Sequence, residues 1–478
     1  MILILLALAQ FMVVLDVAIV NVALPAIQHV FSMSATSLQW IITAYTLTFG
    51  GFLLLGGRAA DLFGRRRVFL IGVVLFTLAS LADGLSQSGG QLIVFRAIQG
   101  VAAAFMSPAA LSIILVTYRE GHERNVALAV WGAVASGGAA VGVLAGGIIT
   151  QYLDWRWNFF VNVPVGVLVV VASMMILDRH KSEVGHRSLD LFGAVTATAG
   201  LMTLVYALVK APVEGWTSFM SLLRFEIVIA LLLAFIINES RVKHPLVPLG
   251  IFKIRNLSGA DSLMLCMTAG MFSIFFFTTL YLQEVLGYTP IKTGVSFLVV
   301  PVAVAIAATN VPRLVKKIGY KPILMVAPLL VSAGLFWMSF IPVNGTFWGD
   351  VAPGMILLGF GMGATFVSVT IAATSGVPPS ESGLASGILN TSQQVGGAIG
   401  LAVLTGIATS SAMRYVQDLH LMAPPGREVV AAATVHGFHD GYLIASTFGI
   451  AASLIATFVI KQKQGDKLDV SPADLAGV

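Results

Sequence analysis

The sequence predicts an all-α membrane protein with 14 transmembrane helices, arranged as six, then two, then six. Of its 478 residues, 57% are hydrophobic and only 10% are charged, whereas soluble domains carry about 25% charged residues. Long apolar runs recur along the whole chain, and the basic residues collect in alternate gaps between them. The 48 glycines suit close helix packing in lipid. A soluble protein of this length would need far more charged surface.

A spanning helix needs about 20 mostly apolar residues. The first six candidate runs are Ile2–Ile27, Leu38–Gly56, Val68–Leu85, Gln91–Val116, Val126–Ile149 and Trp157–Leu177. Two more runs follow at Leu191–Val209 and Leu222–Asn238. The last six are Leu257–Leu282, Thr293–Val311, Pro322–Ile341, Val351–Thr374, Gly383–Ser410 and Gly441–Ile460. These runs predict an N-terminal six-helix bundle (1–180), two accessory helices with their loops (181–250), a C-terminal six-helix bundle (251–462) and a cytoplasmic tail (463–478).

Loop charges predict the orientation in the membrane. With both termini placed in the cytoplasm, most of the 27 Lys and Arg residues fall on the inside, as the positive-inside rule requires. The outside segments then hold only Arg156, Lys210, Arg224, Lys292, Arg414 and Arg427. The rule explains the net charge of +5 better than nucleic-acid binding does. The first run lacks a basic leader and a small-residue cleavage site, so we expect a retained helix in the plasma membrane.

The sharpest motif follows the second run. Gly57, Asp61, Gly64 and Arg65 form the pattern G-x-x-x-D-x-x-G-R, which continues with Arg66. The pattern resembles the signature loop of the major facilitator superfamily, and a weaker echo at 312–319 follows the tenth run, as expected of two repeated halves. The resemblance implies that the Asp and Arg of the motif latch the two halves on the cytoplasmic side. The alternative is a basic anchoring loop with one stray carboxylate.

Three further segments resemble one branch of that superfamily, the fourteen-helix drug:proton antiporters of the multidrug efflux type. They are 15–25 in the first run, 155–166 at the fifth-to-sixth junction and His244-Pro-Leu-Val-Pro248 after the eighth run. The resemblance covers nearly the whole chain. It implies a fold that works by alternating access and a function in proton-coupled export.

Asp16 is the leading candidate for proton coupling or substrate binding. It lies in an apolar helix, where a carboxylate costs about 2.5–3.5 kcal/mol to insert, so a function is the default interpretation. Asn21 lies in the same helix, but Gln10 and Asn21 share a face from which Asp16 points away by more than about 100°. We therefore expect that these three side chains do not all line one cavity. A structural Asp within the bundle is the alternative.

Arg96 begins a second polar group in the fourth run. With Gln99, it lies on one polar, small-residue stripe of a helix. The family resemblance links an Arg at this place to proton transfer. An Arg beside Asp16 would stabilise the carboxylate, and its departure would favour the bound proton, so the pair could couple a proton to a conformational change. Alternatively, Arg96 reaches out to the membrane surface.

Glycines of the fifth run form a predicted helix-packing motif. Its members are Gly138, Gly142, Gly146 and Gly147. They resemble the antiporter motif of the family, in which a Gly-Pro pair is usual, but here Val143 follows Gly142, which weakens the antiport interpretation. Packing between small-residue helix faces is the alternative.

Other polar and soft side chains allow more than one interpretation. For Asp261 the alternatives are a place on a cavity wall and a place at the cytoplasmic interface. Gln393 and Gln394 either face the transport pore or point away from it. A Met and Phe stripe between Met264 and Phe277 forms an adaptable binding surface or, as we favour, faces lipid. The sequence shows neither metal-ligand spacing nor a phosphate-binding loop, so we expect no metal, no cofactor and no ATP-driven pump.

The sequence thus predicts a transporter and not an enzyme. Its expected partners are a small amphipathic molecule, protons and the lipid bilayer, without nucleic acid, and the sequence allows a monomer. The favoured function is proton-driven export of amphipathic drugs or metabolites across the plasma membrane. The rivals are a facilitator that imports a small nutrient and a transport-inactive membrane sensor.

Overall fold

The fold was analysed in a computed structural model that describes residues 1–118, 122–177, 190–243, 245–378, 381–420 and 426–462. Within these ranges every regular element is a helix. Fourteen helices there are long and apolar enough to cross a membrane. The predicted fold class is therefore confirmed.

The N-terminal half supplies six of the spans. They are built from α1 (Ile2–Phe31), α2 (Ala35–Leu38), α3 (Trp40–Phe63), α4 (Arg65–Leu85), α5 (Gly89–Thr117), α6 (His122–Tyr152), α7 (Trp157–Phe160) and α8 (Asn162–Ile176). Between α3 and α4 the chain reverses at Gly64, whose φ of 93° suits a residue without a Cβ. The Ser88 hydroxyl caps α5 by accepting from the backbone N–H of Gln91.

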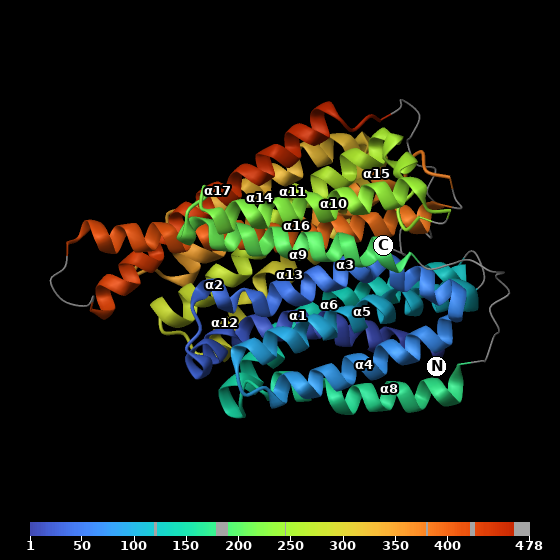
Figure 1. The fold of residues 1–478 in the computed structure, drawn as a ribbon, viewed down its shortest axis with the longest axis horizontal. Helices are drawn as coiled ribbons and strands as arrows, with labels where there is room; N and C mark the ends of the chain where they lie inside the picture. Colours follow the sequence, from blue (N-terminus) through green and yellow to red (C-terminus); the bar gives the residue numbers. More distant parts are fainter. Residues whose placement is uncertain (119–121, 178–189, 244, 379–380, 421–425, 463–478) are drawn as a thin grey trace.

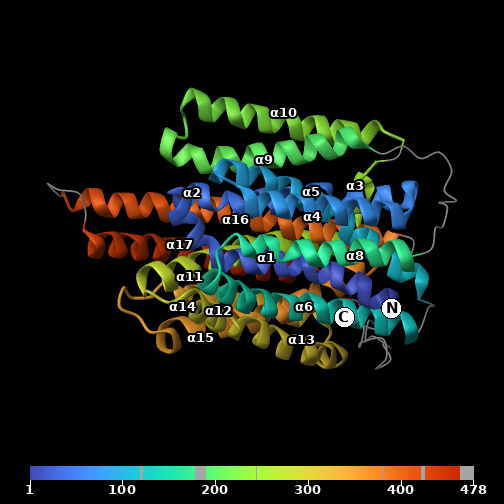
Figure 2. The ribbon, with the colours of Figure 1, turned by 90° about the horizontal axis from the view of Figure 1, so that it is seen from below.

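The two accessory helices form a hairpin beside the main bundle (Figure 2). Helix α9 (Leu191–Glu214) packs against α3 and α16, whereas α10 (Phe219–Arg241) packs on α9. The outer face of α10 is apolar and exposed, as expected of a helix that faces lipid. An ion pair of 2.6 Å between Arg224 and Glu214 joins the two helices near their turn. This hydrogen bond lowers the pKa of the Glu214 carboxyl.

The C-terminal half supplies the remaining six spans. They are built from η1 (Leu249–Lys253), α11 (Arg255–Leu280), η2 (Tyr281–Val285), α12 (Pro290–Phe297), α13 (Val299–Ile318), α14 (Tyr320–Met338), η3 (Phe347–Val351), α15 (Ala352–Thr374), α16 (Ser382–Asp418) and α17 (Arg427–Phe458). Pro290 begins α12 in the first turn, where its missing N–H costs nothing, and the Thr289 hydroxyl caps the helix.

Several predicted boundaries are wrong because hydropathy marks the membrane crossing and not the whole helix. Helix α17 begins at Arg427, well before the predicted Gly441, and the predicted loop from Gly57 is helical as far as Phe63. The predicted domain limit at 180/181, the tail 463–478 and His244 lie outside the described residues. The limit at 250/251 falls within η1.

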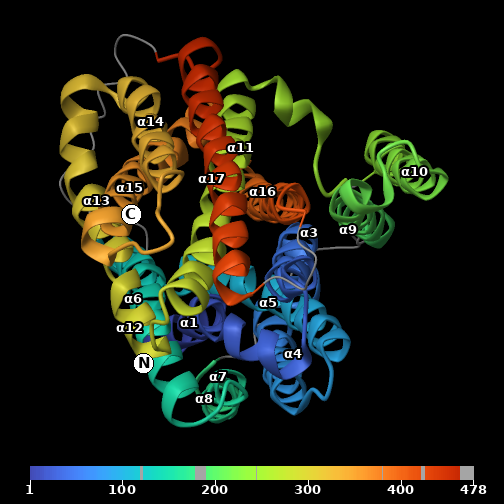
Figure 3. The same ribbon diagram turned by 90° about the vertical axis from the view of Figure 1, so that its left-hand side faces the viewer.

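The spans run side by side, and α1 begins at the same end of the bundle as α17 finishes (Figure 1). We name this the terminal end and the other the opposite end. Viewed along the helices, the two halves meet where α6 lies beside α12 and α3 lies beside α16 (Figure 3). Helix α1 packs against α11 between these two contacts.

Candidate functional site

A central cavity of about 1340 Å³ lies between the two halves. Helices α1, α3, α5 and α6 line it from one side, and α11 to α13, α15 and α16 line it from the other. At the terminal end it extends to Arg58 and Asp61 of α3 and to Glu381 before α16. Ligand pockets for drug-sized molecules measure about 300–1,000 Å³, so this cavity has room for such a molecule.

The inner wall of the cavity combines aromatic and uncharged polar side chains. The carboxamides are Gln10, Asn21, Asn390, Gln393 and Gln394. The aromatic residues are Phe49, Trp131, Phe272, Phe275 and Phe297. The Gln10 carboxamide accepts a hydrogen bond of 3.0 Å from Ser107, and Asn21 donates one of 2.8 Å to the Val17 carbonyl. The charged lining residues are those at the terminal end, so the interior offers hydrogen bonds without formal charge.

Close backbone contacts seal the cavity at the opposite end. A Cβ on Gly294 of α12 would lie 2.3 Å from the Val143 carbonyl oxygen of α6, and one on Gly147 would lie 2.7 Å from that of Pro290. The Gln283 carboxamide donates to the Val22 carbonyl at 2.9 Å across the same seam. His29 and Glu284 also meet at 2.9 Å. The cavity is therefore closed at the opposite end in this conformation.

A buried polar cluster lies within the N-terminal half. Arg96 donates to Oδ2 of Asp16 at 2.5 Å, and Gln99 donates to Oδ1 of the same carboxylate at 2.9 Å. The Arg96 guanidinium also donates to Oε1 of Gln99 and to the Ile41 carbonyl. All three residues are at most 1% exposed. The interpretation in which Arg96 reaches the membrane surface is therefore wrong, because its charge is neutralised inside the bundle.

Three residues that the sequence reasoning did not assign to a site complete the cluster. Asn162 donates to Oδ1 of Asp16 and to the Ser80 hydroxyl, each at 3.0 Å. Ser80 also accepts from Gln99 at 3.1 Å. The Arg96 guanidinium carbon lies 4.3 Å from the ring centroid of Tyr45, a cation–π distance. The signal for Ser80 and Tyr45 was weak, because a lone hydroxyl in an apolar run is common.

The cluster and the cavity occupy different faces of α1. Gln10 and Asn21 are lining residues of the cavity, whereas Asp16, Arg96 and Gln99 are not. This agrees with the expectation from helical periodicity that Asp16 points away from the other two. The structure thus brings Asp16, Arg96 and Gln99 together and leaves Asn21 on the cavity wall.

The motif after the second span lies at the terminal end, beside the cavity mouth. Asp61 is among the lining residues there, and its carboxylate is 3.5 Å from Arg65. The Asp61 side chain is exposed to solvent, and that of Arg65 is partly exposed. Arg66 donates to the Met174 carbonyl of α8 at 3.0 Å, and Gly57 faces Pro108 of α5.

The glycine motif packs α6 against α1 and α12. Added Cβ atoms at Gly138, Gly142 and Gly146 would each lie within 3.2 Å of an α1 atom, from Val14, Ala18 and Ile19 respectively. Gly147 instead faces Pro290 in the other half. The motif therefore contributes both to the N-terminal half and to the seal.

The remaining candidates fall into two groups. Gln393, Gln394, Met271, Phe272 and Phe275 line the cavity. The expectation that the Met and Phe stripe faces lipid is wrong for its other members, which pack inside the C-terminal half: Met264, Met267, Phe276 and Phe277. Asp261 is also buried there, is not a lining residue of the cavity, and its carboxylate has no hydrogen-bond partner among the described residues.

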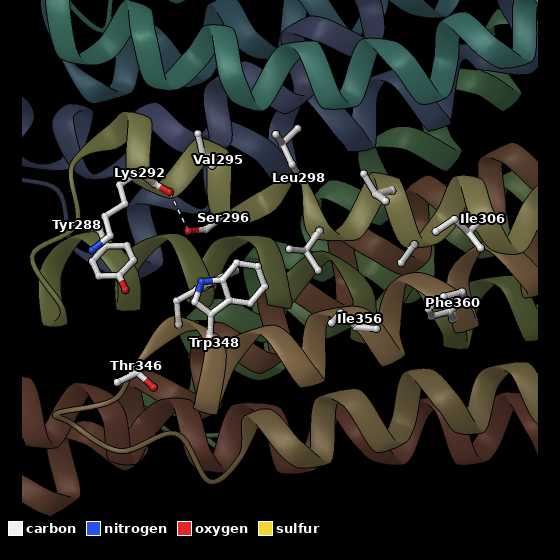
Figure 4. Close-up of a pocket in the computed structure, with 14 residues that line it drawn as sticks. Tyr288, Lys292, Val295, Ser296, Leu298, Ile306, Thr346, Trp348, Ile356 and Phe360 are labelled. Carbon is white, nitrogen blue, oxygen red and sulfur yellow. Dashed lines mark hydrogen bonds between the residues drawn. The ribbon is translucent and has the colours of Figure 1, made fainter.

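A second, lateral groove of about 810 Å³ follows the outer surface of α12, α13 and α15 (Figure 4). Trp348, Ile356 and Phe360 form part of its apolar wall. At one end the Lys292 ammonium lies 3.5 Å from the ring centroid of Tyr288. The groove lies on the face of α12 and α13 away from the central cavity. We therefore take the central cavity as the candidate substrate site.

Comparisons with known proteins agree with this architecture. Residues 6–401 match the family model described as Major Facilitator Superfamily. The puromycin resistance protein of Streptomyces alboniger is 40% identical over 450 residues, which cover 94% of this chain and 88% of that protein. The cephamycin export protein of Amycolatopsis lactamdurans is 37% identical over 410 residues, 84% of each chain.

A solved structure shares the fold. It is a bacterial homologue of the human lysosomal transporter Spinster in an inward-facing and occupied conformation, with a TM-score of 0.68, 15% identity and 96% coverage of both chains. The chain belongs to the major facilitator superfamily. It is a multi-pass membrane transporter and not an enzyme, and its relatives include antibiotic resistance and export proteins.

Proposed function

We propose that this protein exports amphipathic small molecules across the plasma membrane in exchange for protons. The observation that carries the proposal is the pairing of a buried, charged Asp16–Arg96 cluster with a separate, uncharged cavity in one transporter fold. The names of the relatives, which refer to puromycin resistance and cephamycin export, favour the outward direction. A proton that moves inward through 100 mV releases about 2.3 kcal/mol, enough to bias one step of the cycle.

The substrate occupies the central cavity in this proposal. Its aromatic rings, such as Phe272 and Phe275, offer apolar contact, and carboxamides such as Gln394 offer hydrogen bonds. A mixed lining of this kind favours molecules with an apolar body and several polar groups. Amphipathic drugs and secondary metabolites have this character.

Proton coupling takes place at the Asp16–Arg96 pair. In this conformation Arg96 donates to the Asp16 carboxylate, which is the arrangement that stabilises its ionised form. In a conformation that moves Arg96 away, the buried carboxylate loses its partner and takes up a proton, because an isolated buried charge is costly. Asn21 contributes to the substrate side of the cycle and Gln99 holds the pair in place.

The latch motif acts at the cavity mouth. Among the described residues Asp61 has one ion pair, the 3.5 Å contact with Arg65, and we propose that it binds a basic group or a helix N-terminus when the halves close. Asp61→Asn should lower transport about tenfold or more, since about 1.4 kcal/mol of lost bias corresponds to tenfold, while protein abundance stays normal. Transport at the wild-type rate would reduce the motif to an anchor.

The proposal places both termini in the cytoplasm, so that the cavity mouth faces inward in this conformation. The distribution of loop charge supports that orientation. A reporter enzyme that is active only in the cytoplasm should be active when it is fused to the C-terminus, and one that is active only in the periplasm should be inactive there. A periplasmic signal would reverse the direction assigned to the cavity.

Export is tested with everted membrane vesicles that contain the full chain. Puromycin and a cephamycin are offered to vesicles with an acidic lumen, so that protons flow out of the vesicle as substrate enters, and again after an ionophore collapses the gradient. Gradient-dependent accumulation of at least one compound is expected. Accumulation only in right-side-out vesicles would favour the importer, and no transport across a broad panel would favour the inactive sensor. The two-bundle domain limits and the monomeric state stay predictions.

A further inference from the structure

A second carboxyl group lies next to the Asp16–Arg96 cluster and has no partner. Asp83 is on α4, one helical turn beyond Ser80 of the cluster, and its side chain is completely buried. Neither of its carboxyl oxygens has a hydrogen-bond partner among the described residues. An ionised carboxylate without partners in such a place is strongly disfavoured, whereas the protonated, neutral acid costs much less.

The charges around Asp83 are few and can be named. The groups that act on it electrostatically are Arg96 of α5 and Asp16 of α1, and the phenol of Tyr45 on α3 stacks under Arg96. Directly before α7, Arg156 donates to the carbonyls of Gly84 and Ser86, which follow Asp83 in the chain. None of the hydrogen bonds from Arg96 or Arg156 in the described structure goes to the Asp83 carboxyl.

The charge balance of the cluster then allows one proton. Arg96 contributes one positive charge, and two carboxyl groups stand near it. With Asp16 ionised and bonded to Arg96, a neutral site requires that Asp83 hold a proton. With Asp83 ionised and bonded to Arg96, Asp16 must hold it instead. Two arrangements of equal charge are thus available to the same three side chains.

We propose that Asp83 is a second proton-binding group and that Arg96 exchanges between Asp16 and Asp83 during the transport cycle. The O–H bond at Asp83 breaks, its proton passes to Asp16, and the new Asp83 carboxylate accepts the Arg96 hydrogen bonds that Asp16 gives up. No other reactant is consumed. The direction of this step rests on the proposed function. Under that function the opposite end of the bundle faces outward, and Asp83 lies closer to this end of α4 than Ser80 does.

The path between the two acids is polar. Ser80 lies one turn from Asp83 on the same helix and accepts hydrogen bonds from Gln99 and Asn162. These two amides also donate to Oδ1 of Asp16. Ser80, whose hydroxyl donates to the Phe159 carbonyl, therefore belongs to the hydrogen-bond network of Asp16 and lies one helical turn from Asp83.

The test is infrared difference spectroscopy of the purified full chain in detergent, without any substrate. Subtraction of the Asp83→Asn spectrum from the wild type should leave the C=O band of a protonated carboxylic acid, which shifts in D₂O. Asp83→Glu should retain such a band and so exclude misfolding as the cause of its loss. Asp350→Asn is the matched control, because Asp350 already accepts hydrogen bonds from Thr346 and should contribute no such band.

The exchange is tested by repeating the subtraction in the Asp16→Asn background. There Arg96 has lost its partner, so Asp83 should ionise and its band should disappear. Absence of the band in the wild type would overturn proton binding at Asp83. Persistence of the band in the Asp16→Asn background would overturn the exchange and leave Asp83 as a neutral structural acid. Both outcomes are independent of transport, so they are distinguishable from a failure of the export proposal.

Discussion

The buried cluster and the central cavity lie on two faces of the same helix and differ in every physical property that matters for transport. The cluster around Asp16 and Arg96 is charged, fully buried and closely hydrogen-bonded. The cavity is wide, reaches the terminal end and is uncharged in its interior. Charge in a small volume permits proton binding, whereas a large uncharged wall permits varied ligands. Under the proposed function, the proton and the substrate therefore do not compete for one carboxylate.

Because the cavity and the cluster are separate, substrate specificity and proton binding should respond to different substitutions. A change on the cavity wall alters substrate contacts without touching the hydrogen bonds of Asp16. A change in the cluster alters proton binding and leaves the wall intact. The two sites must then communicate through helix movement, and α1, α3 and α5 each contribute residues to both. The seal at the opposite end, where α6 and α12 meet, is where that movement is most constrained.

The largest expected effect concerns the charge balance of the cluster. In the double variant Asp16→Asn/Asp83→Asn, Arg96 is left buried without a carboxylate, and breaking a buried ion pair in this way costs about 3–5 kcal/mol. Each single variant keeps one carboxylate and should lose much less. The free energy of unfolding in detergent, measured for both singles and the double, checks this. Additive losses would mean that the two acids do not share Arg96.

The next effect concerns the seal. Gly294→Ala places a Cβ against the Val143 carbonyl, and overpacking of this kind costs about 1–3 kcal/mol, or about 5- to 150-fold in the closed population. Transport should fall, and a cysteine at Asn21, in a Cys266→Ser background, should react faster with a thiol reagent added outside. Gly90→Ala is the control, since nothing lies within 4 Å of its added Cβ. Unchanged labelling would mean that this contact does not hold the seal closed.

The smallest effect concerns the cavity wall. Gln394→Ala removes a carboxamide but keeps the Cβ that packs against Gly50. The loss of one hydrogen bond is worth about 0.5–1.5 kcal/mol, so apparent affinity should weaken by about 2- to 10-fold for substrates that use it. The pH dependence of transport should not change. Gln417→Ala, at an exposed position on the same helix, is the control. A shifted pH profile of transport in Gln394→Ala would mean that the cavity wall and the cluster are not separate sites.

The sequence predicted the fold class, and it singled out the buried residues Asp16 and Arg96, for physical reasons that can be stated. Apolar runs of spanning length predict helices because lipid leaves the backbone no other way to satisfy its hydrogen bonds. Asp16 and Arg96 were found because charge inside such a run is costly, and the opposed faces of Asp16 and Asn21 follow from helical periodicity. These inferences need only local information.

The parts that the sequence did not predict depend on which helix faces meet. Ser80 and Tyr45 join the cluster only because α4 and α3 pack beside α5. The burial of Phe276 and Phe277 depends on the contacts of α11 with α16 and α17. Hydropathy could not indicate that α17 continues to Arg427, because that part of the helix carries polar residues. Tertiary packing, which one sequence does not report, decides each of these.

The central claim, that proton coupling and substrate binding occupy separate sites, is tested most directly with Asp16→Asn in proteoliposomes. Two quantities are measured in the same vesicles with puromycin or another transported compound: uphill transport driven by a pH gradient, and downhill counterflow without one. The account predicts that gradient-driven transport is lost while counterflow and substrate binding stay near the wild-type level. Full gradient-driven transport, or loss of substrate binding together with coupling, would contradict it.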